Sequence, residues 1–148
     1  MVQPANYFSL LKHVNPIEID QQGWDACVSA AVTRGLQAQV NLSGYASPEL
    51  STQFVWNYAQ YLKGPAENMG WDVTMRAVMY KGIPLASDWA WLAGHEGEIP
   101  PPNWIAAKAF GHVVGSYESI QVSSNYMSNV DKTEAELMKG HIVYIAEK

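Results

Sequence analysis

Apolar residues recur at helical spacing in three segments of the first two thirds of the chain. The first segment predicts a long helix over about 25–40. A second helix is expected to open within 48–53 and to stop at Gly64. A third is expected over about 72–81, where Gly82 supplies a left-handed terminator. The first 24 residues are predicted to be mostly irregular, because prolines and a glycine interrupt them.

The remainder of the chain has a different pattern, in which prolines, glycines and β-branched residues replace the helical spacing. In order, we expect a loop over 94–102, a helix over 103–110, a strand over 113–122, a capping-box helix from Thr133 to Gly140 and a strand over 141–146. Helices come first and strands last, which is typical of an α+β fold and not of alternating βαβ units.

Composition limits the kind of protein this can be. The 148 residues are 48% apolar, which suits one compact domain, residues 1–148. A formal net charge of -5 makes nucleic acid an unexpected partner. No run approaches the length of a membrane span, and the N-terminus does not resemble a secretion signal. We therefore expect a protein of the cytoplasm, or one carried into a larger particle such as a virion.

The chain has one cysteine, Cys27, so an internal disulfide framework and a cysteine-cluster zinc site are excluded, and no metal or cofactor is expected. A buried small hydrophobe and a reactive thiol both remain open for it. In the first turn of a helix, free N–H groups and the macrodipole would stabilise a thiolate. Gln21 or Gln22 could supply an amide to a developing oxyanion. Asp25, the expected N-cap, would oppose the thiolate by its charge.

The segment around Cys27 resembles the nucleophile loop of papain-like cysteine peptidases. Gln21 stands six positions before Cys27, and the run Asp20-Gln21, four residues, Ala26-Cys27-Val28 matches a pattern of that family. The resemblance implies that Cys27 is the nucleophile and that Gln21 is the oxyanion donor. The match extends in order over almost the whole chain.

Two further features follow from the resemblance alone. The segment 68–71 is similar to the family's substrate-binding segment, so Gly70 would pair with an extended peptide substrate and Trp71 would lie beside it. A core position and a protein interface also stay open for Trp71. The implied architecture is a helical subdomain over about 1–110, followed by the start of an incomplete antiparallel sheet over about 111–148.

The family's catalytic histidine and the residue that orients it are missing from the expected place. They lie tens of residues beyond the last predicted strand, and this chain ends five residues after Val143. His141 comes nearest to a general base, although it precedes that strand. The two predicted strands would also leave unpaired edges, so we expect other protein subunits, or copies of this chain, to complete the sheet.

Three functions are compatible with these observations. The first is a papain-like peptidase-fold protein that is non-catalytic and serves as a structural or assembly subunit of a larger complex. The second is a cysteine peptidase acting on a peptide substrate, with Cys27 as nucleophile and with its histidine and asparagine supplied by missing sequence or a partner chain. The third is an unrelated α+β binding domain.

Overall fold

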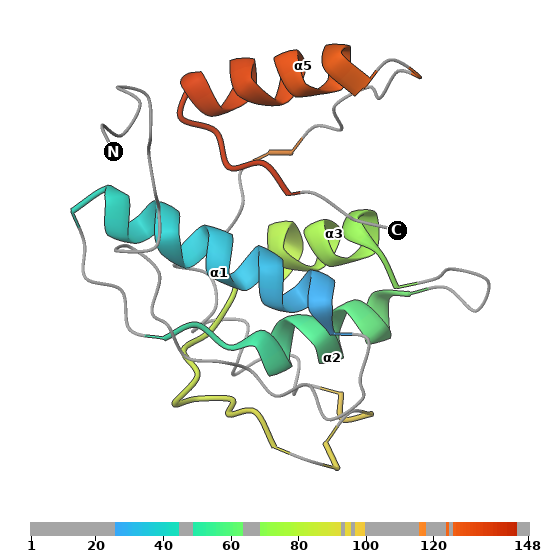
Figure 1. The fold of residues 1–148 in the computed structure, drawn as a ribbon. Helices are drawn as coiled ribbons and strands as arrows, with labels where there is room; N and C mark the ends of the chain where they lie inside the picture. Colours follow the sequence, from blue (N-terminus) through green and yellow to red (C-terminus); the bar gives the residue numbers. More distant parts are fainter. Residues whose placement is uncertain are drawn as a thin grey trace. The chain divides into compact units, whose positions relative to one another are not determined.

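The fold is taken from a computed structural model, which describes residues 26–44, 49–63, 69–92, 94–95, 97–99, 116–117, 124 and 126–144. These residues contain the helices α1 (Cys27–Leu42), α2 (Thr52–Leu62), α3 (Trp71–Lys81) and α5 (Tyr126–Met138), labelled in Figure 1. The chain divides into two compact units, Met1–Val114 and Gly115–Lys148. The first three helices belong to the first unit and α5 belongs to the second.

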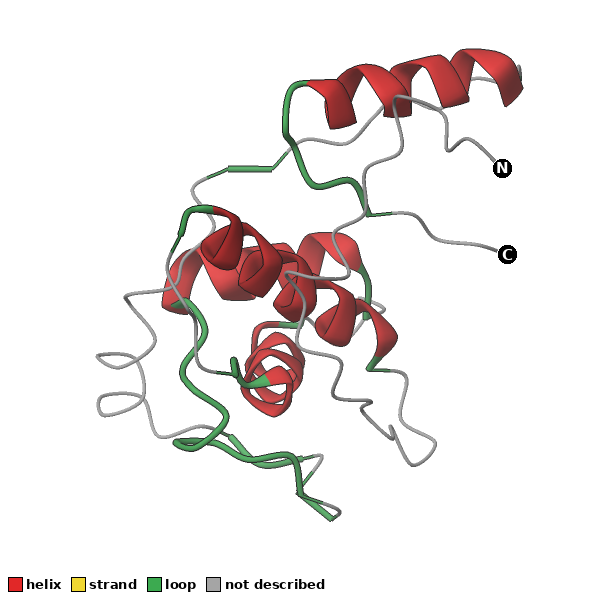
Figure 2. Ribbon diagram, turned by 60° about the vertical axis from the view of Figure 1, so that its left-hand side comes forward, coloured by secondary structure: helices red, strands yellow, loops and turns green. Residues whose placement is uncertain are grey.

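The predicted α+β fold is wrong for the part of the chain that the structure describes. These residues are 60% helical and form no sheet, so Figure 2 shows them only as helices and loops. Their one strand-type contact is an isolated antiparallel bridge between Leu50 and Leu85. The described residues therefore indicate a mostly helical fold, and the incomplete antiparallel sheet implied by the resemblance is not found among them.

The two predicted strands have different outcomes. Nearly all of 113–122 lies outside the described residues, apart from 116–117, which are not in a strand. Residues 141–144 are described and form no strand, although they are rich in β-favouring side chains. A β-rich run becomes a strand only when a neighbouring strand takes up its N–H and C=O groups. No described segment does this for 141–144.

Helix α1 runs close to its predicted limits but begins differently. Its N-cap is Ala26, which makes no side-chain capping bond, and the helix extends to Leu42. Asp25, the predicted cap, lies outside the described residues, as does the predicted helix over 103–110. The long helix is confirmed, whereas its predicted cap is not the residue that occupies the N-cap position.

Helix α2 begins, and helix α3 ends, at a residue suited to that position. Ser51 caps α2, and its hydroxyl accepts a 3.0 Å hydrogen bond from the Phe54 N–H. Gly82 ends α3 with φ +71° and ψ -166°, a backbone region that is essentially restricted to glycine. The predicted terminator at Gly82 is confirmed.

The three helices of the first unit pack against one another in all three pairs (Figures 1 and 2). Each contributes buried apolar side chains to the contact, and fully burying one such side chain stabilises the fold by about 1.5–3 kcal/mol. The buried residues include Val32 and Leu36 from α1, Phe54, Val55 and Ala59 from α2, and Val73, Ala77 and Val78 from α3.

The segment that follows α3 runs back along the start of α2. The Ser51 N–H donates to the Pro84 carbonyl at 2.9 Å, and the Ala86 N–H donates to the Glu49 carbonyl at 2.7 Å. These bonds flank the isolated bridge and fix the segment to the N-terminal end of α2. The loop that follows, which carries Leu92, His95 and Glu98, therefore starts from a fixed point.

Helix α5 is longer than the predicted one. It begins at Tyr126, about two turns before the capping-box sequence at Thr133, so that sequence lies inside the helix and does not start it. Gly140 follows the helix with φ +83°, a left-handed conformation that glycine adopts readily, and the predicted helix end is confirmed there.

Candidate functional site

Cys27 is the first residue of α1, and its thiol is free and exposed. The N–H groups of a first helical turn have no partner within the helix, and they lie at the positive end of the helix dipole. The prediction that Cys27 stands at a helix start is confirmed. Gln21, its predicted oxyanion partner, lies outside the described residues, so the pair stays a prediction.

Gly70 and Trp71 lie at the start of α3. Gly70 is the N-cap, with an extended backbone, and a Cβ placed on it would meet nothing within 4 Å. The space beside this backbone is therefore open to a ligand, but the Gly70 carbonyl already accepts a 3.1 Å hydrogen bond from the Thr74 N–H. Trp71 is partly buried. Substrate binding at these two residues stays a prediction.

His141, the predicted base, follows α5 in the second unit, whereas Cys27 belongs to the first. Its Nδ1 lies 2.7 Å from Oε2 of Glu136, and the other oxygen of that carboxylate accepts from Lys139 Nζ at 2.6 Å. The hydrogen bonds from Lys139 and then His141 lower the pKa of the Glu136 carboxyl. His141 is thus bound to a carboxylate of its own segment, and its role as a base for Cys27 stays a prediction.

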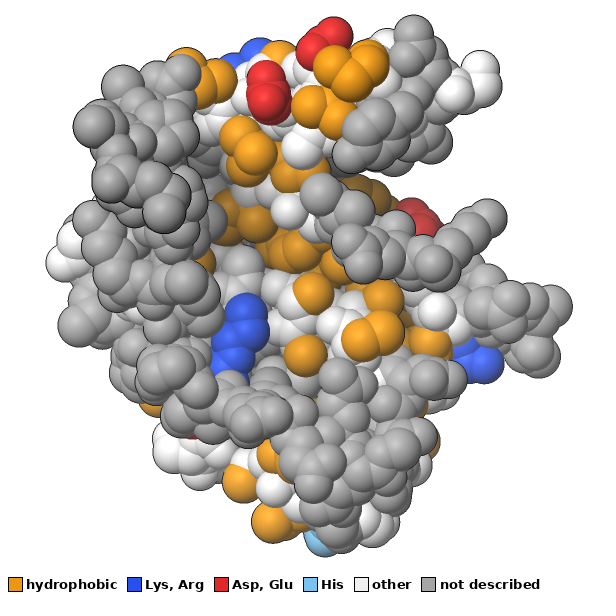
Figure 3. Space-filling view, viewed as in Figure 1, with side chains coloured by type: hydrophobic (Ala, Val, Ile, Leu, Met, Phe, Trp, Pro, Cys, Tyr) orange, Lys and Arg blue, Asp and Glu red, His pale blue; other side chains and the backbone are white. Residues whose placement is uncertain are grey.

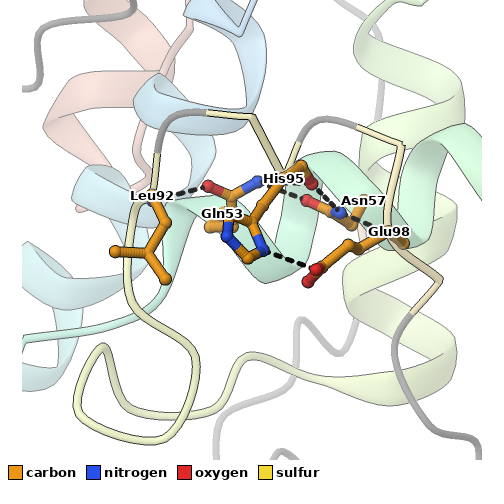
Figure 4. A network of polar contacts seen from close by, with 5 residues as sticks. All are labelled: Gln53, Asn57, Leu92, His95 and Glu98. Atoms are coloured by element: carbon orange, nitrogen blue, oxygen red, sulfur yellow. Dashed lines mark hydrogen bonds and ion pairs between the residues drawn. The ribbon is translucent and has the colours of Figure 1, made fainter.

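Two buried amides of α2 form a polar network that the sequence analysis did not predict. Gln53 and Asn57 lie four residues apart on α2, each about 1% exposed, and Gln53 Nε2 donates to Asn57 Oδ1 at 2.6 Å. Figure 4 shows both side chains pointing from the helix toward the loop that carries Leu92, His95 and Glu98. The network connects a buried helix face to an irregular segment.

All the polar groups of these two side chains are hydrogen-bonded, and all of them except Asn57 Oδ1 bond to the loop. Gln53 Oε1 accepts from the Leu92 N–H at 3.1 Å, and Asn57 Nδ2 donates to the carbonyls of His95 at 2.8 Å and Glu98 at 2.6 Å (Figure 4). A weaker bond of 3.3 Å joins Gln53 Nε2 to the His95 carbonyl. Buried amides that are fully bonded in this way keep an irregular loop in one conformation.

The loop held by the network lines a pocket of about 170 Å³. Its walls are formed by Asp88, Trp89, Ala90, Leu92, His95 and Glu98. Within it, His95 Nδ1 lies 2.5 Å from Oε1 of Glu98, and both side chains are partly exposed. The pocket thus combines apolar walls, an imidazole and two carboxylates.

A sequence signal for this network exists, although it is weak. Gln53 and Asn57 are polar residues at i and i+4 within a helix whose neighbouring side chains are apolar, and this spacing places them on one face. Their partners are backbone groups about 40 residues away. No sequence pattern indicates which carbonyl a buried amide will bind.

Other classes of site receive no support from the described residues. They contain no group of three or more His, Cys, Asp or Glu side chains able to hold a metal ion, and none of their helices is long and apolar enough to cross a membrane. On the face seen in Figure 3, the described Lys and Arg side chains lie in separate places and form no continuous basic patch.

Comparison with known proteins adds no family to this description. No protein-family model matches the chain, and neither a curated protein nor a solved structure gives a match.

Proposed function

We propose that this protein is a non-catalytic structural subunit of a larger assembly, which it enters through exposed aromatic and apolar side chains on α2 and α3. The observation that carries the proposal is the exposure of Tyr61 (59%), Met79 (39%) and Tyr80 (70%), which we call the tyrosine surface. Tyrosine and methionine are enriched at protein interfaces, and tyrosine is common among residues that dominate binding energy.

Tyr61, the first residue of this surface, packs against a neighbouring aromatic ring. The ring centroids of Tyr58 and Tyr61 are 5.8 Å apart, and Lys81 Nζ of α3 lies 5.9 Å from the Tyr58 centroid. Burial, followed by the charge of Tyr61, raises the pKa of Tyr58. A ring that already packs against a neighbour loses less side-chain entropy on binding. This favours Tyr61 as an interface residue.

The positions of the described histidines also favour a non-catalytic function. His95 contacts Glu98, three residues away, and His141 contacts Glu136, five residues away. Each imidazole therefore joins the two ends of its own short segment. Such contacts are typical of local structural roles.

The test is self-association measured by sedimentation velocity across a range of protein concentrations. We expect the wild-type chain to associate, and we expect Tyr61→Glu and Tyr80→Glu to shift it toward monomer, because each places a charge in an apolar contact. The control is Gln39→Glu, which adds the same charge at an exposed position of α1. A wild-type chain that stays monomeric at all concentrations, or one that both tyrosine variants leave unchanged, contradicts the proposal.

A second candidate function is a cysteine peptidase with Cys27 as nucleophile. It is favoured by the exposed thiol at the start of a 16-residue helix. Gln21 would serve as the oxyanion donor, and the proposal requires His141 or a histidine from another chain to reach Cys27.

The rate of Cys27 alkylation as a function of pH tests this candidate. A catalytic thiol titrates well below the ordinary value of about 8.5, and His141→Phe should then raise its pKa if His141 is the base. The control is His95→Phe, which removes an imidazole from the loop after α3. An alkylation profile with an ordinary pKa, unchanged in both variants, rules out the peptidase.

A further inference from the structure

We propose that the pocket lined by Asp88, Trp89, Ala90, Leu92, His95 and Glu98 binds one basic side chain, lysine or arginine, of a partner subunit. This inference rests on the proposed assembly function and names the chemistry of one contact within it. It concerns a different surface from the tyrosine surface, so the two can be tested separately.

The pocket is held in shape before any ligand arrives. Gln53 and Asn57 are buried and hold the backbone of Leu92, His95 and Glu98, three of the residues that line it (Figure 4). Buried amides are costly unless they are bonded, so their network resists rearrangement of the loop. A rigid loop binds with a smaller loss of conformational entropy.

The aromatic wall is fixed as well. The Trp89 ring packs edge-on against the buried Phe54 ring, with centroids 6.4 Å apart and planes at 81°. Its backbone carbonyl accepts a 2.5 Å hydrogen bond from the Ser51 hydroxyl, the same hydroxyl that caps α2. Trp89 remains partly exposed at the pocket. Tryptophan is the aromatic side chain that attracts cations most strongly.

The size of the pocket restricts its ligand. Pockets for drug-sized molecules are about 300–1,000 Å³, and this one is about 170 Å³. It therefore suits a single side chain. Trp89, Ala90 and Leu92 offer apolar contact to a methylene stem, as long basic side chains require when their charged head lies at a polar rim.

The charges of the pocket select a cation. Two of the lining residues, Asp88 and Glu98, are acidic, and His95 contacts the Glu98 carboxylate. Carboxylates next to an aromatic face favour ammonium and guanidinium groups over neutral or anionic ones. The whole chain carries a formal charge of -5, so this pocket favours a basic partner subunit, whereas contact between copies of this chain is assigned to the tyrosine surface.

The test uses the full chain and two blocked tripeptides, acetyl-Gly-Lys-Gly-amide and the same peptide with an acetylated lysine. Binding is followed by the indole N–H resonance of Trp89, which is assigned by its loss in Trp89→Phe. We expect the lysine peptide to shift this resonance saturably, and the acetylated peptide to bind at least about fivefold more weakly.

Variants of the carboxylates locate the charge contact. Glu98→Gln and Asp88→Asn should each weaken the lysine peptide about two- to fivefold, the range for a partly exposed ion pair. Glu98→Gln keeps the Glu98 carbonyl that Asn57 binds, so the loop stays in place. The control is Glu134→Gln, an exposed position outside the pocket lining, which should leave binding unchanged.

Three results would overturn the inference: no shift with the lysine peptide, equal binding of the acetylated peptide, or equal weakening by Glu134→Gln. Failure of the assembly proposal looks different, because it appears as a monomeric chain that the tyrosine variants do not affect. A chain that self-associates but ignores the lysine peptide therefore keeps the assembly function and loses the pocket assignment.

Discussion

At the scale of single residues, the strongest feature of this protein is the difference between buried polar groups that are bonded and those that are not. Asn57 and Thr74 are both about 1% exposed or less. Asn57 donates to two loop carbonyls, whereas the Thr74 hydroxyl has no hydrogen-bond partner among the described residues. The same kind of substitution should therefore have opposite effects at the two positions.

We predict that Asn57→Leu lowers the free energy of unfolding by about 1–3 kcal/mol, because it leaves the Glu98 carbonyl without a partner and removes a bond to the His95 carbonyl. In the matched variant Thr74→Val, a hydroxyl with no partner is replaced by a methyl group of similar shape. Its unfolding free energy should stay equal or rise by about 1 kcal/mol.

Chemical denaturation of both variants measures these changes. Amide hydrogen exchange at Leu92 adds a local readout, since loss of the network should speed its exchange in Asn57→Leu and leave it unchanged in Thr74→Val. Equal destabilisation by the two variants would mean that the hydrogen bonds of the network add no stability beyond the packing of its side chains.

At the scale of elements, α3 lies between two glycines with different backbone requirements. Gly70 has φ -160°, which any residue adopts, and Gly82 has φ +71° with ψ -166°, which essentially only glycine adopts. Serine is also a favoured N-cap residue. We predict that Gly82→Ser destabilises the protein by about 1–3 kcal/mol, whereas Gly70→Ser is neutral or stabilising.

Thermal or denaturant unfolding of the two serine variants provides the comparison. Gly70→Ser also serves the peptidase candidate, since it should fold normally while placing a side chain against any peptide bound at Gly70. If both variants lower the free energy of unfolding by the same amount, the backbone conformation at Gly82 is not the reason that Gly82→Ser is destabilising.

The end of α5 gives a prediction about pH. The hydrogen bonds from Lys139 and His141 lower the pKa of the Glu136 carboxyl below its ordinary value of 4.5. A lowered pKa in the folded state means that the stabilisation is present above the unfolded pKa and is lost as the pH falls through the folded pKa. Lys139→Gln removes the larger cause, so the Glu136 pKa should rise toward 4.5.

Carbon-detected NMR titration of the Glu136 carboxyl measures this shift directly. Lys132→Gln, which removes the lysine inside α5, serves as the control and should change the Glu136 pKa less than Lys139→Gln does. A Glu136 pKa that is already ordinary in the wild-type chain would contradict the contacts with Lys139 and His141.

The elements also show how far the sequence could predict the structure. Helices with a long apolar period were found, as α1, α2 and α3 demonstrate, and the glycine end of α3 was found as well, because these signals are local. The strand over 141–146 was predicted from local β-propensity alone, and propensity does not supply a partner strand. The network of Gln53 and Asn57 was missed because its partners lie about 40 residues away in the chain.

At the scale of the whole molecule, the two proposals respond to salt in opposite directions. The chain carries a formal charge of -5, so copies of it repel one another, and salt screens this repulsion. Contact through the tyrosine surface is mainly apolar and should therefore strengthen as ionic strength rises. Binding of a lysine peptide at Asp88 and Glu98 depends on attraction between opposite charges and should weaken.

Sedimentation and the Trp89 titration, repeated from about 0.01 to 1 M salt, follow both effects, because the screening length falls over that range from about 30 to 3 Å. Glu98→Gln should flatten the salt dependence of peptide binding and leave that of self-association unchanged. Tyr61→Glu should alter the salt dependence of self-association and leave that of peptide binding unchanged. If the two properties change in the same direction with salt, one surface is responsible for both, and the separation between the pocket and the tyrosine surface is wrong.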